Sequence, residues 1–342
     1  MIPHCQMNDL LKPYQNILII KPGAVGDLLQ LTPVVRALRI YSPGSEITLM
    51  VGSETTAALF RYDPHVSATV VFDHTGKHRS LSALFELWRT LRSRHYDLIL
   101  NFQRSNLKAW FFTAAAVPCR VLVYHKAKGR TVHAVVNYLE TLAPLGIPAT
   151  DTALELCLDA AARAFARDTF SSRGLDGTPV IALNPGASHA VNRWPPARFA
   201  ELADQITERL SAQAVIIGGP DDVRLAEEIA ALSRSKPLSL AGKTNLLQLG
   251  AVLERCDALV SGDTGPLHMA TAVGTKTIAL FGAADPLRTG PVGKGHTVIQ
   301  AAGVACVPCR SRSCSNQRYL ECMESITVRE VTDIAAGLLR TT

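Results

Sequence analysis

The stretch CDALVSGDTGPLHMATAVGTKTIALFG, residues 256–282, decides the fold. An apolar run at 258–260 ends in Ser-Gly-Asp-Thr-Gly, small residues typical of a helix follow, and a β-branched run at 277–281 ends in glycine. This order predicts a strand, a turn, a helix and a parallel strand. In such a unit, strand ends and helix N-termini form the ligand site, and unpaired amides there favour a phosphate. Asp263 and Thr264 lie at the turn, where a simple helix N-cap is an equally good interpretation.

Strands and helices alternate through the rest of the chain as well. We predict strands at 180–184, 214–217 and 238–240 before this stretch, and at 16–21, 46–51, 68–72, 96–102 and 121–124 in the first half. Predicted helices lie between them, for example at 28–39, 81–93, 107–116, 223–233 and 246–255. Such alternation predicts parallel βα units and the α/β fold class.

Two similarly built halves are expected. The segment VIALNPGAS at 180–188 repeats the order of ILIIKPGAV at 17–25, an apolar strand, a polar residue and Pro-Gly-Ala. Turn residues at 174–179 predict a linker. We therefore divide the chain into an N-terminal extension at 1–15, a Rossmann-like domain at 16–173, the linker at 174–179, a second Rossmann-like domain at 180–325 and a C-terminal helix at 326–342.

Composition limits the class of partner. The 342 residues are 47% hydrophobic and 19% charged, which suits buried parallel sheets, and the net charge of +6 is mild. No arginine-rich or RNP-like stretch indicates a nucleic acid, so we expect an anionic small molecule or transient contact with the edge of an anionic membrane. The first fifteen residues lack the apolar core of a signal peptide, and no run is long enough to span a membrane, so we expect a cytoplasmic protein.

Candidate functional residues follow several predicted strands. In the first half Asp27 comes after a Gly-containing turn, where a carboxylate either complements a helix dipole or acts as a general base. Cations that would receive an acidic acceptor, or simply form a solvated surface, are Arg104, Lys126, Lys128 and Arg130. In the second half polar loops follow four strands, and one ligand site built from all four explains them most simply.

Taken together, Gly26-Asp27, NPGAS at 184–188 followed by RWP at 193–195, GGPDD at 218–222 and DTGPLH at 263–268 resemble glycosyltransferase family 9, the heptosyltransferases of lipopolysaccharide core assembly. The resemblance covers nearly the whole chain from about residue 16. It implies a GT-B fold, two Rossmann-like domains with an interdomain cleft, in which the first domain binds the acceptor and the second the nucleotide sugar. It also implies inverting transfer of heptose from ADP-heptose to an anionic lipid-linked oligosaccharide, without a catalytic cofactor or metal.

The resemblance also implies roles for single residues. Asp27 matches the general base that takes a proton from the acceptor hydroxyl. The donor-binding positions are Ser188 at the phosphates, Asp222 at the ribose, Thr244 near the adenine, Asp263 at the heptose hydroxyls, and Thr264, Gly265 and His268 at the pyrophosphate. The family usually has Lys-x-Trp-Pro where this chain has Asn192 before Arg193 and Trp194. We therefore expect Arg193 to neutralise the leaving diphosphate, unless activity is weaker or donor choice is altered.

The last cluster consists of cysteines. Cys306, Cys309, Cys314 and Cys322 lie within seventeen residues, a spacing that fits a structural zinc site or an iron–sulfur cluster, and fits equally a loop of reduced thiols or disulfides. Three functions stay open at this point. They are heptose transfer to a Kdo or heptose acceptor of the lipopolysaccharide core, transfer of another sugar or to a protein or other glycan, and nucleotide-sugar binding without catalysis.

Overall fold

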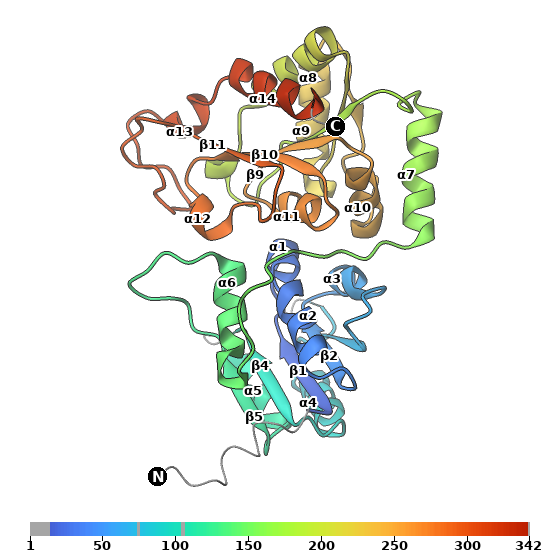
Figure 1. The fold of residues 1–342 in the computed structure, drawn as a ribbon, viewed down its shortest axis with the longest axis vertical. Helices are drawn as coiled ribbons and strands as arrows, with labels where there is room; N and C mark the ends of the chain where they lie inside the picture. The colour runs from blue at the N-terminus through green and yellow to red at the C-terminus, as the bar shows by residue number, and fades with distance from the viewer. Residues whose placement is uncertain (1–13, 74–75, 104–106, 341–342) are drawn as a thin grey trace. The chain divides into compact units, whose positions relative to one another are not determined.

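The computed structural model describes residues 14–73, 76–103 and 107–340. The chain divides into two compact units, Met1–Thr152 and Ala153–Thr342. Each unit has a parallel β-sheet with helices on both faces (Figure 1). The prediction of an α/β fold with two parallel-sheet domains is confirmed.

The sheet of the first unit has five parallel strands in the order β3-β2-β1-β4-β5. Their bounds are β1 Asn16–Ile20, β2 Glu46–Val51, β3 Ala68–Val71, β4 Leu98–Asn101 and β5 Arg120–Val123. The strands are short and almost wholly apolar because both faces are buried. The strand order reverses between β1 and β4, which is the point where ligands bind in open α/β sheets.

Helices cover both faces of this sheet. They are α1 Val25–Leu29, α2 Thr32–Tyr41, α3 Glu54–Ala57, α4 Leu81–Arg92, α5 Leu107–Ala115 and α6 Ala134–Leu139, with 3₁₀ turns η3 Ala58–Phe60 and η4 Glu140–Leu145. The single helix predicted at 28–39 is two helices, because Pro33 lies in the first turn of α2, where its missing N–H is tolerated. Leu87 and Leu91 of α4 and Phe112 of α5 pack with Leu18, Ile20 and Ile99 of the sheet.

The sheet of the second unit has six strands in the order β11-β10-β9-β6-β7-β8. Their bounds are β6 Val180–Asn184, β7 Gln213–Ile216, β8 Leu238–Ser239, β9 Ala258–Gly262, β10 Lys276–Phe281 and β11 His296–Gln300. The order reverses between β6 and β9, as in dinucleotide-binding folds. The stretch at 256–282 forms β9, a helix and β10, as predicted.

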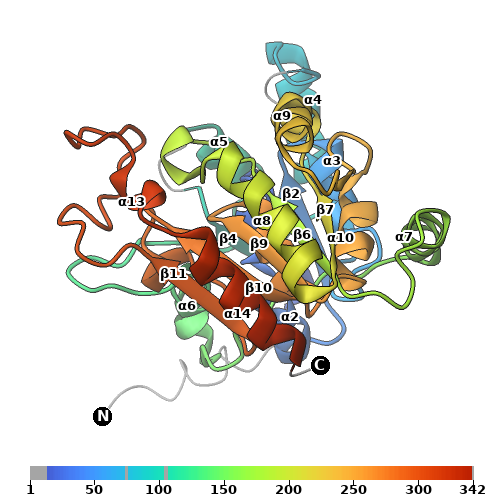
Figure 2. The ribbon, with the colours of Figure 1, turned by 90° about the horizontal axis from the view of Figure 1, so that it is seen from above.

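The helices of this unit are α7 Ala160–Ser172, α8 Pro196–Leu210, α9 Val223–Leu232, α10 Leu246–Glu254, α11 Gly265–Ala272, α12 Pro286–Thr289, α13 Glu321–Glu324 and α14 Val328–Arg340, with 3₁₀ turns η5 Ala190–Asn192 and η6 Pro220–Asp222. Figure 2 shows α14, the predicted C-terminal helix, beside α8 on one face of the sheet. Trp194, Phe199 and Val331 belong to the core between these helices and the sheet.

The division between the units differs from the predicted one. Residues 174–179 do not link two units but lie inside the second, where they join α7 to β6. Sequence reasoning overlooked α7, whose N-cap Asp159 accepts a hydrogen bond from the Ala162 amide. Because α7 packs against α10, it belongs to the second unit, and the boundary falls between Thr152 and Ala153. Strand β11 was also overlooked. Residues 1–13, most of the predicted extension, lie outside the described part of the chain.

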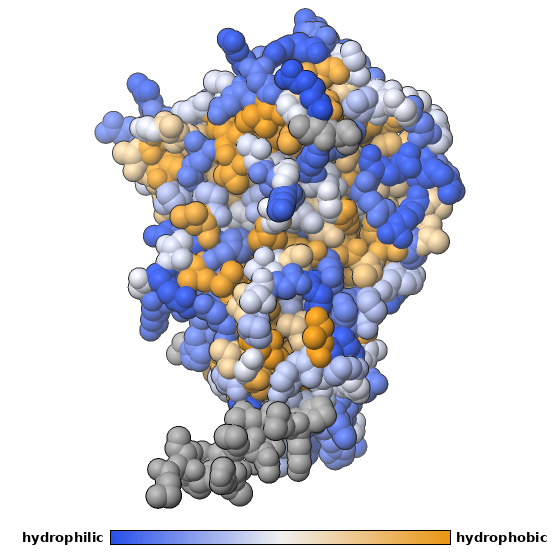
Figure 3. Space-filling view, viewed as in Figure 1, coloured by the Kyte–Doolittle hydropathy of each residue, from blue (hydrophilic) through white to orange (hydrophobic). Residues whose placement is uncertain are grey.

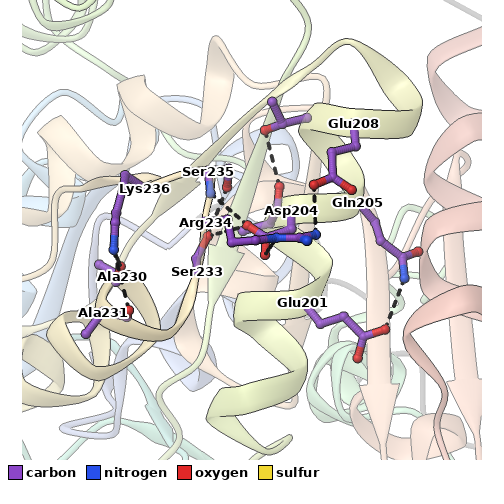
Figure 4. A network of polar contacts seen from close by, with 12 residues as sticks. Glu201, Asp204, Gln205, Glu208, Ala230, Ala231, Ser233, Arg234, Ser235 and Lys236 are labelled. Atoms are coloured by element: carbon purple, nitrogen blue, oxygen red, sulfur yellow. Dashed lines mark hydrogen bonds and ion pairs between the residues drawn. The ribbon is translucent and has the colours of Figure 1, made fainter.

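A polar network joins α8 to the segment after α9 (Figure 4). Buried Asp204 accepts hydrogen bonds from the Ser233 hydroxyl at 2.7 Å and the Ser235 amide at 2.8 Å, and its other oxygen pairs with Arg234 at 3.3 Å. Burial of Asp204 opposes ionisation, but these hydrogen bonds outweigh it and hold the pKa of Asp204 at about 2. The ionised Asp204 carboxylate therefore holds residues 233–235, which lead from α9 to β8, against α8.

The surface of the chain carries both hydrophobic and hydrophilic residues. Figure 3 shows hydrophobic residues interspersed with hydrophilic ones over the face that it draws. Within the described ranges, no helix combines the length and the apolar character that crossing a bilayer requires.

Candidate functional site

Asp27 lies at the point where the strand order of the first sheet reverses. Strand β1 ends at Ile20, the loop 21–24 follows, and Asp27 is the third residue of α1. The neighbouring strand β4 ends at Asn101, whose side-chain oxygen accepts a hydrogen bond from the Gln103 amide. The carboxylate therefore lies at the carboxyl end of the sheet, where α/β folds bind ligands.

Two side chains hold the Asp27 carboxylate. Lys21 Nζ lies 3.2 Å from Asp27 Oδ2, and the Tyr138 hydroxyl donates a hydrogen bond of 3.2 Å to Asp27 Oδ1. The Asp27 side chain is 45% exposed and that of Lys21 only 7%, so a buried cation supports an accessible anion. Lys21 Nζ also lies 5.2 Å from the centre of the Tyr138 ring.

Tyr138 acts as a neutral donor in this arrangement. Burial, together with the negative charge of Asp27, raises the pKa of Tyr138 far above its ordinary value. Its ring packs edge-on against Phe102 and Tyr124. Sequence reasoning overlooked Lys21 and Tyr138, although Lys21, a charged residue directly after a buried strand, was a signal that could have been used.

The cationic loop after β5 lies against α6, the helix that carries Tyr138. Asn137 of α6 accepts a hydrogen bond from the Ala127 amide at 2.9 Å and donates one to the His125 carbonyl at 3.0 Å. Lys126, Lys128 and Arg130 line one pocket of about 1080 Å³ together with His125, Asn137 and Glu140. The loop that carries Lys126, Lys128 and Arg130 and the hydroxyl that bonds to Asp27 are thus held by adjacent residues of α6, Asn137 and Tyr138.

The acceptor cations differ among themselves. Lys126 and Lys128 are exposed, but both terminal nitrogens of Arg130 bond to the two carboxylate oxygens of Glu140, at 3.0 and 2.6 Å. This pairing raises the pKa of Arg130 and compensates its charge within the chain. Arg130 therefore offers less positive potential than its sequence position suggested. Arg104 lies outside the described residues.

The predicted donor-binding residues follow four strands that are neighbours in the second sheet, in the order β9-β6-β7-β8. Ser188 and Arg193 follow β6, Asp222 follows β7 and Thr244 follows β8, while Asp263, Thr264, Gly265 and His268 follow β9. Parallel strands place all these loops at one edge of the sheet. The loops after β7 and β8 touch, since the Gly242 amide bonds to the Gly218 carbonyl at 3.0 Å.

A hydrogen-bond network joins the ends of β6 and β9. The Asn184 side-chain amide donates to the hydroxyls of Ser261 and Thr264, both at 2.9 Å, and these two hydroxyls lie 2.9 Å apart. Thr264 stands at the N-cap position of α11, but its side chain makes no capping hydrogen bond. The simple N-cap interpretation of Thr264 is therefore wrong. Asn184, a polar residue ending a buried strand, was not among the predicted site residues.

Asp222 lies over two glycines. Its Oδ2 accepts a hydrogen bond from the Gly219 amide at 2.9 Å. A Cβ atom added to Gly186 would lie within 2.6 Å of the Asp222 carboxyl atoms, so only glycine leaves room for the carboxylate there. An acidic side chain after the second strand, beside the first glycine-containing loop, has the place of the ribose ligand in dinucleotide-binding folds.

Arg193 fixes the loop that carries Ser188. Its Nε and Nη2 atoms both donate to the Ala187 carbonyl, at 3.1 and 2.8 Å. The neighbouring Asn192 replaces the lysine usual in the resembling family, and its carbonyl lies where a Cβ on Gly262 would clash, at 2.5 Å. The Asn192 side-chain oxygen is buried without a hydrogen-bond partner among the described residues. Arg193 and Ser188 therefore lie on one loop that the bonds to the Ala187 carbonyl restrain, and their contact with phosphate stays a prediction.

Asp263 and His268 are the predicted donor-binding residues that lie close to each other after β9. Asp263 Oδ2 accepts a hydrogen bond from the Thr289 hydroxyl at 2.9 Å, and Asp263 Oδ1 lies 3.8 Å from His268 Nε2. The side chain of Asp263 is 20% exposed and that of His268 only 6%. Asp263 is thus reachable by a ligand, whereas the His268 side chain is almost wholly buried.

The four cysteines, three of them between β11 and α13 and Cys322 within α13, line one pocket of about 410 Å³. All four are free thiols, and Cys322 is buried while Cys306 and Cys309 are exposed. Burial raises the pKa of Cys322. In the part of the chain that the structure describes, no group of three or more His, Cys, Asp or Glu side chains is arranged to hold a metal ion.

Two doubly wound parallel sheets, each with polar loops where its strand order reverses, are the architecture of the GT-B fold, and the chain shares the fold of Escherichia coli ADP-heptose lipopolysaccharide heptosyltransferase II with a TM-score of 0.76. The chain belongs to glycosyltransferase family 9, the heptosyltransferases, whose sequence profile matches residues 84–320. It is therefore a glycosyltransferase, and the resemblance noted from the sequence is confirmed. The roles of the individual site residues stay predictions.

Individual relatives agree over most of the chain. It is 27% identical to lipopolysaccharide heptosyltransferase 3 of Escherichia coli K12, covering 90% of this chain and 94% of that protein. It is 26% identical to the lipopolysaccharide core heptosyltransferase OpsX of Haemophilus influenzae, covering 83% and 84%. Among solved structures, a family 9 glycosyltransferase from Veillonella parvula is similar with a TM-score of 0.84 at 26% identity, covering 97% and 99%.

Proposed function

We propose that this protein transfers heptose from ADP-heptose to a Kdo or heptose residue of the lipopolysaccharide core, with inversion at the anomeric carbon and without a catalytic metal. The names of its relatives, which are heptosyltransferases of lipopolysaccharide and of its core, support heptose transfer to such an acceptor. The observation that carries the proposal is an accessible Asp27 held by Lys21 and Tyr138 at the carboxyl end of the first sheet. The second unit, taken by itself, supports it with polar loops after four adjacent strands.

The first unit supplies the base. Asp27 takes the proton of the acceptor hydroxyl while the oxygen attacks the anomeric carbon on the face opposite the diphosphate, which inverts that centre. Tyr138 and Lys21 are positioning residues that fix the carboxylate. Lys126 and Lys128 attract the anionic oligosaccharide, so acceptor binding should weaken with salt.

The second unit holds the donor. Ser188 and Thr264 contact the phosphates, Asp222 the ribose, Thr244 the adenine side and Asp263 the heptose hydroxyls. Arg193 supplies positive charge near the leaving diphosphate in place of the lysine that Asn192 replaces. Its Nε and Nη2 atoms already donate to the Ala187 carbonyl, so we expect the Nη1 atom to bind the diphosphate.

The test is transfer of heptose from ADP-heptose to a delipidated core oligosaccharide, with ADP release measured and the product anomer assigned by NMR. We expect turnover that survives EDTA and an anomer inverted relative to the donor. Retention of configuration would reject Asp27 as base. A preference for another nucleotide sugar, or for a protein or other glycan acceptor, would favour the second function, and tight donor binding without transfer would favour a non-catalytic binder.

The proposal extends to location. A lipid-linked acceptor and a nucleotide sugar meet at the inner face of the membrane, so we propose a cytoplasmic enzyme in transient contact with the inner membrane. Cell fractionation checks this: the protein should move from the membrane fraction to the supernatant at high salt.

For the cysteine segment we propose a structural metal site. Four thiols around one pocket support it, although the sulfurs would have to move closer to complete a closed zinc or iron–sulfur site. Metal analysis of protein purified without oxygen should find about one site per chain, and the Cys309→Ser variant should lose it. Protein with no bound zinc or iron would support a loop of reduced cysteines.

A further inference from the structure

Exposed apolar side chains concentrate on two helices of the first unit. Half of the large hydrophobic residues that are exposed in the described chain lie in α4, in α5 or just after α5: Leu81, Phe85, Leu107, Trp110, Phe111 and Val117. Leu81 and Leu107 are 84% and 85% exposed, and Phe85 is 55% exposed. Contiguous exposed apolar area of this kind marks an interaction site.

Helical spacing gathers these residues on the outer side of α4 and α5. In α4, residues 81, 85, 88, 89 and 92 share one face, while Leu87 and Leu91 are buried in the core. In α5, residues 107, 110 and 111 share the outer face, while Phe112 is buried. Side chains at these outer positions form the α4–α5 surface: Leu81, Phe85, Trp88, Arg89 and Arg92 of α4, and Leu107, Trp110 and Phe111 of α5.

Aromatic contacts make this surface continuous across the two helices. Phe85 stacks on Trp88 with ring centres 5.8 Å apart, and Trp88 lies 6.4 Å from Phe111. The Arg92 guanidinium lies 5.4 Å from the Trp88 ring centre. Tryptophan, phenylalanine and leucine beside arginine is the composition of segments that lie in a membrane interface.

The positive charge around the α4–α5 surface favours an anionic membrane over a second copy of this chain as its partner. Residues 77–94 contain five lysines and arginines, all exposed, and one acidic residue, Glu86, so this short segment carries +4 of the chain's net charge of +6. Glu86 lies on another flank of α4, where it lines a pocket with Asp73 and Lys77. A positive aromatic surface repels a second copy of itself and attracts anionic lipid headgroups.

We propose that the α4–α5 surface docks this enzyme on a bilayer that contains anionic phospholipid. The inference rests on the proposed function, in which the acceptor is lipid-linked, and locates the contact on the unit that carries Asp27. Phe85, Trp110 and the two leucines enter the headgroup region, while Arg89 and Arg92 pair with lipid phosphates. No residue of this surface belongs to the proposed catalytic or donor-binding set.

Binding of the full chain to sedimented vesicles tests the surface. The probes are vesicles of phosphatidylcholine alone and of phosphatidylcholine with phosphatidylglycerol. We expect binding to the anionic vesicles that falls with salt, a loss of roughly tenfold or more in Phe85→Ser/Trp110→Ser, and a loss of roughly 25-fold in Arg89→Gln/Arg92→Gln. Matched controls in the second unit are Leu232→Ser/Leu287→Ser, at positions 55% and 70% exposed, and Arg173→Gln/Arg224→Gln.

Several results would overturn the proposal. One is equal binding to both vesicle types, and another is a loss in the control variants as large as in the α4–α5 variants. A third is wild-type self-association, seen by light scattering, that Phe85→Ser/Trp110→Ser abolishes while vesicle binding is unchanged. Transfer to the delipidated acceptor should be the same in wild type and surface variants. If wild type itself shows no transfer, the proposed function fails, and the vesicle result still judges the surface.

Discussion

Replacing Asp27 separates its catalytic role from its structural one. Asp27→Asn keeps the size of the side chain but removes the negative charge beside Lys21, whose side chain is 93% buried by the neighbouring atoms. Losing one partner of a fully buried ion pair costs about 3–5 kcal/mol. Because Asp27 is 45% exposed and partly screened by water, we expect about 1–2 kcal/mol here. For a unit of this size that corresponds to a decrease in Tm of roughly 3–8 °C.

The double variant Lys21→Met/Asp27→Asn completes the experiment. It removes the buried cation as well, so the unfolding free energy should recover by most of that 1–2 kcal/mol. Activity should not recover, because losing a general base costs about 10²–10⁴-fold in kcat. The assays are thermal unfolding of the wild type, Lys21→Met, Asp27→Asn and the double variant, and ADP release with the delipidated acceptor. Asp27→Asn activity within tenfold of wild type, or activity regained in the double variant, would refute the assignment of Asp27 as base.

Three further predictions concern the second unit. Thr264→Val should cost about 1–2 kcal/mol of stability and raise the donor KM, because it strips a hydroxyl from Asn184 and Ser261, whereas Thr264→Ser should behave as wild type in urea unfolding and kinetics. Gly186→Ala should displace the Asp222 carboxylate and weaken ADP binding at least about tenfold by calorimetry, while Gly44→Ala, at an open exposed position, should not. Because the folded pKa of Asp204 is about 2, below its ordinary 3.8, its contribution of about 2 kcal/mol is present above pH 4 and lost between pH 4 and 2. Wild type should therefore lose more stability than Asp204→Asn over that window, and parallel acid unfolding curves would contradict this.

Much of the fold follows from local patterns. Buried parallel strands are almost wholly apolar and are bounded by turn residues, so ten of the eleven described strands could be predicted, including the two in the stretch at 256–282. Strand β11 was not predicted because only one of its five residues is buried, so its sequence lacks the apolar run of the other strands. The linker was misplaced for a different reason: Gly174 and Gly177 adopt positive φ at the end of α7, and such turns look alike whether or not a unit ends there.

The candidate site divides in the same way. Loops after adjacent parallel strands converge by geometry alone, which is why the predicted donor residues lie at one edge of the second sheet. Contacts between residues distant in sequence carry no local signal: Tyr138 lies 111 residues from Asp27, and Glu140, which compensates Arg130, is one helix away in a segment without a motif. The predicted roles of the site residues come from the family resemblance, whereas the contacts that support Asp27 and Arg130 depend on packing that the sequence does not reveal.

The bonds between Asn184, Ser261 and Thr264 have a consequence for affinity. Protein atoms alone complete this network, so the ends of β6 and β9 lose their conformational freedom when the chain folds rather than when a nucleotide arrives. Little ordering entropy then opposes association at this edge of the sheet. Fragments of the donor that keep only its diphosphate should accordingly retain a large share of the binding free energy of the complete nucleotide sugar.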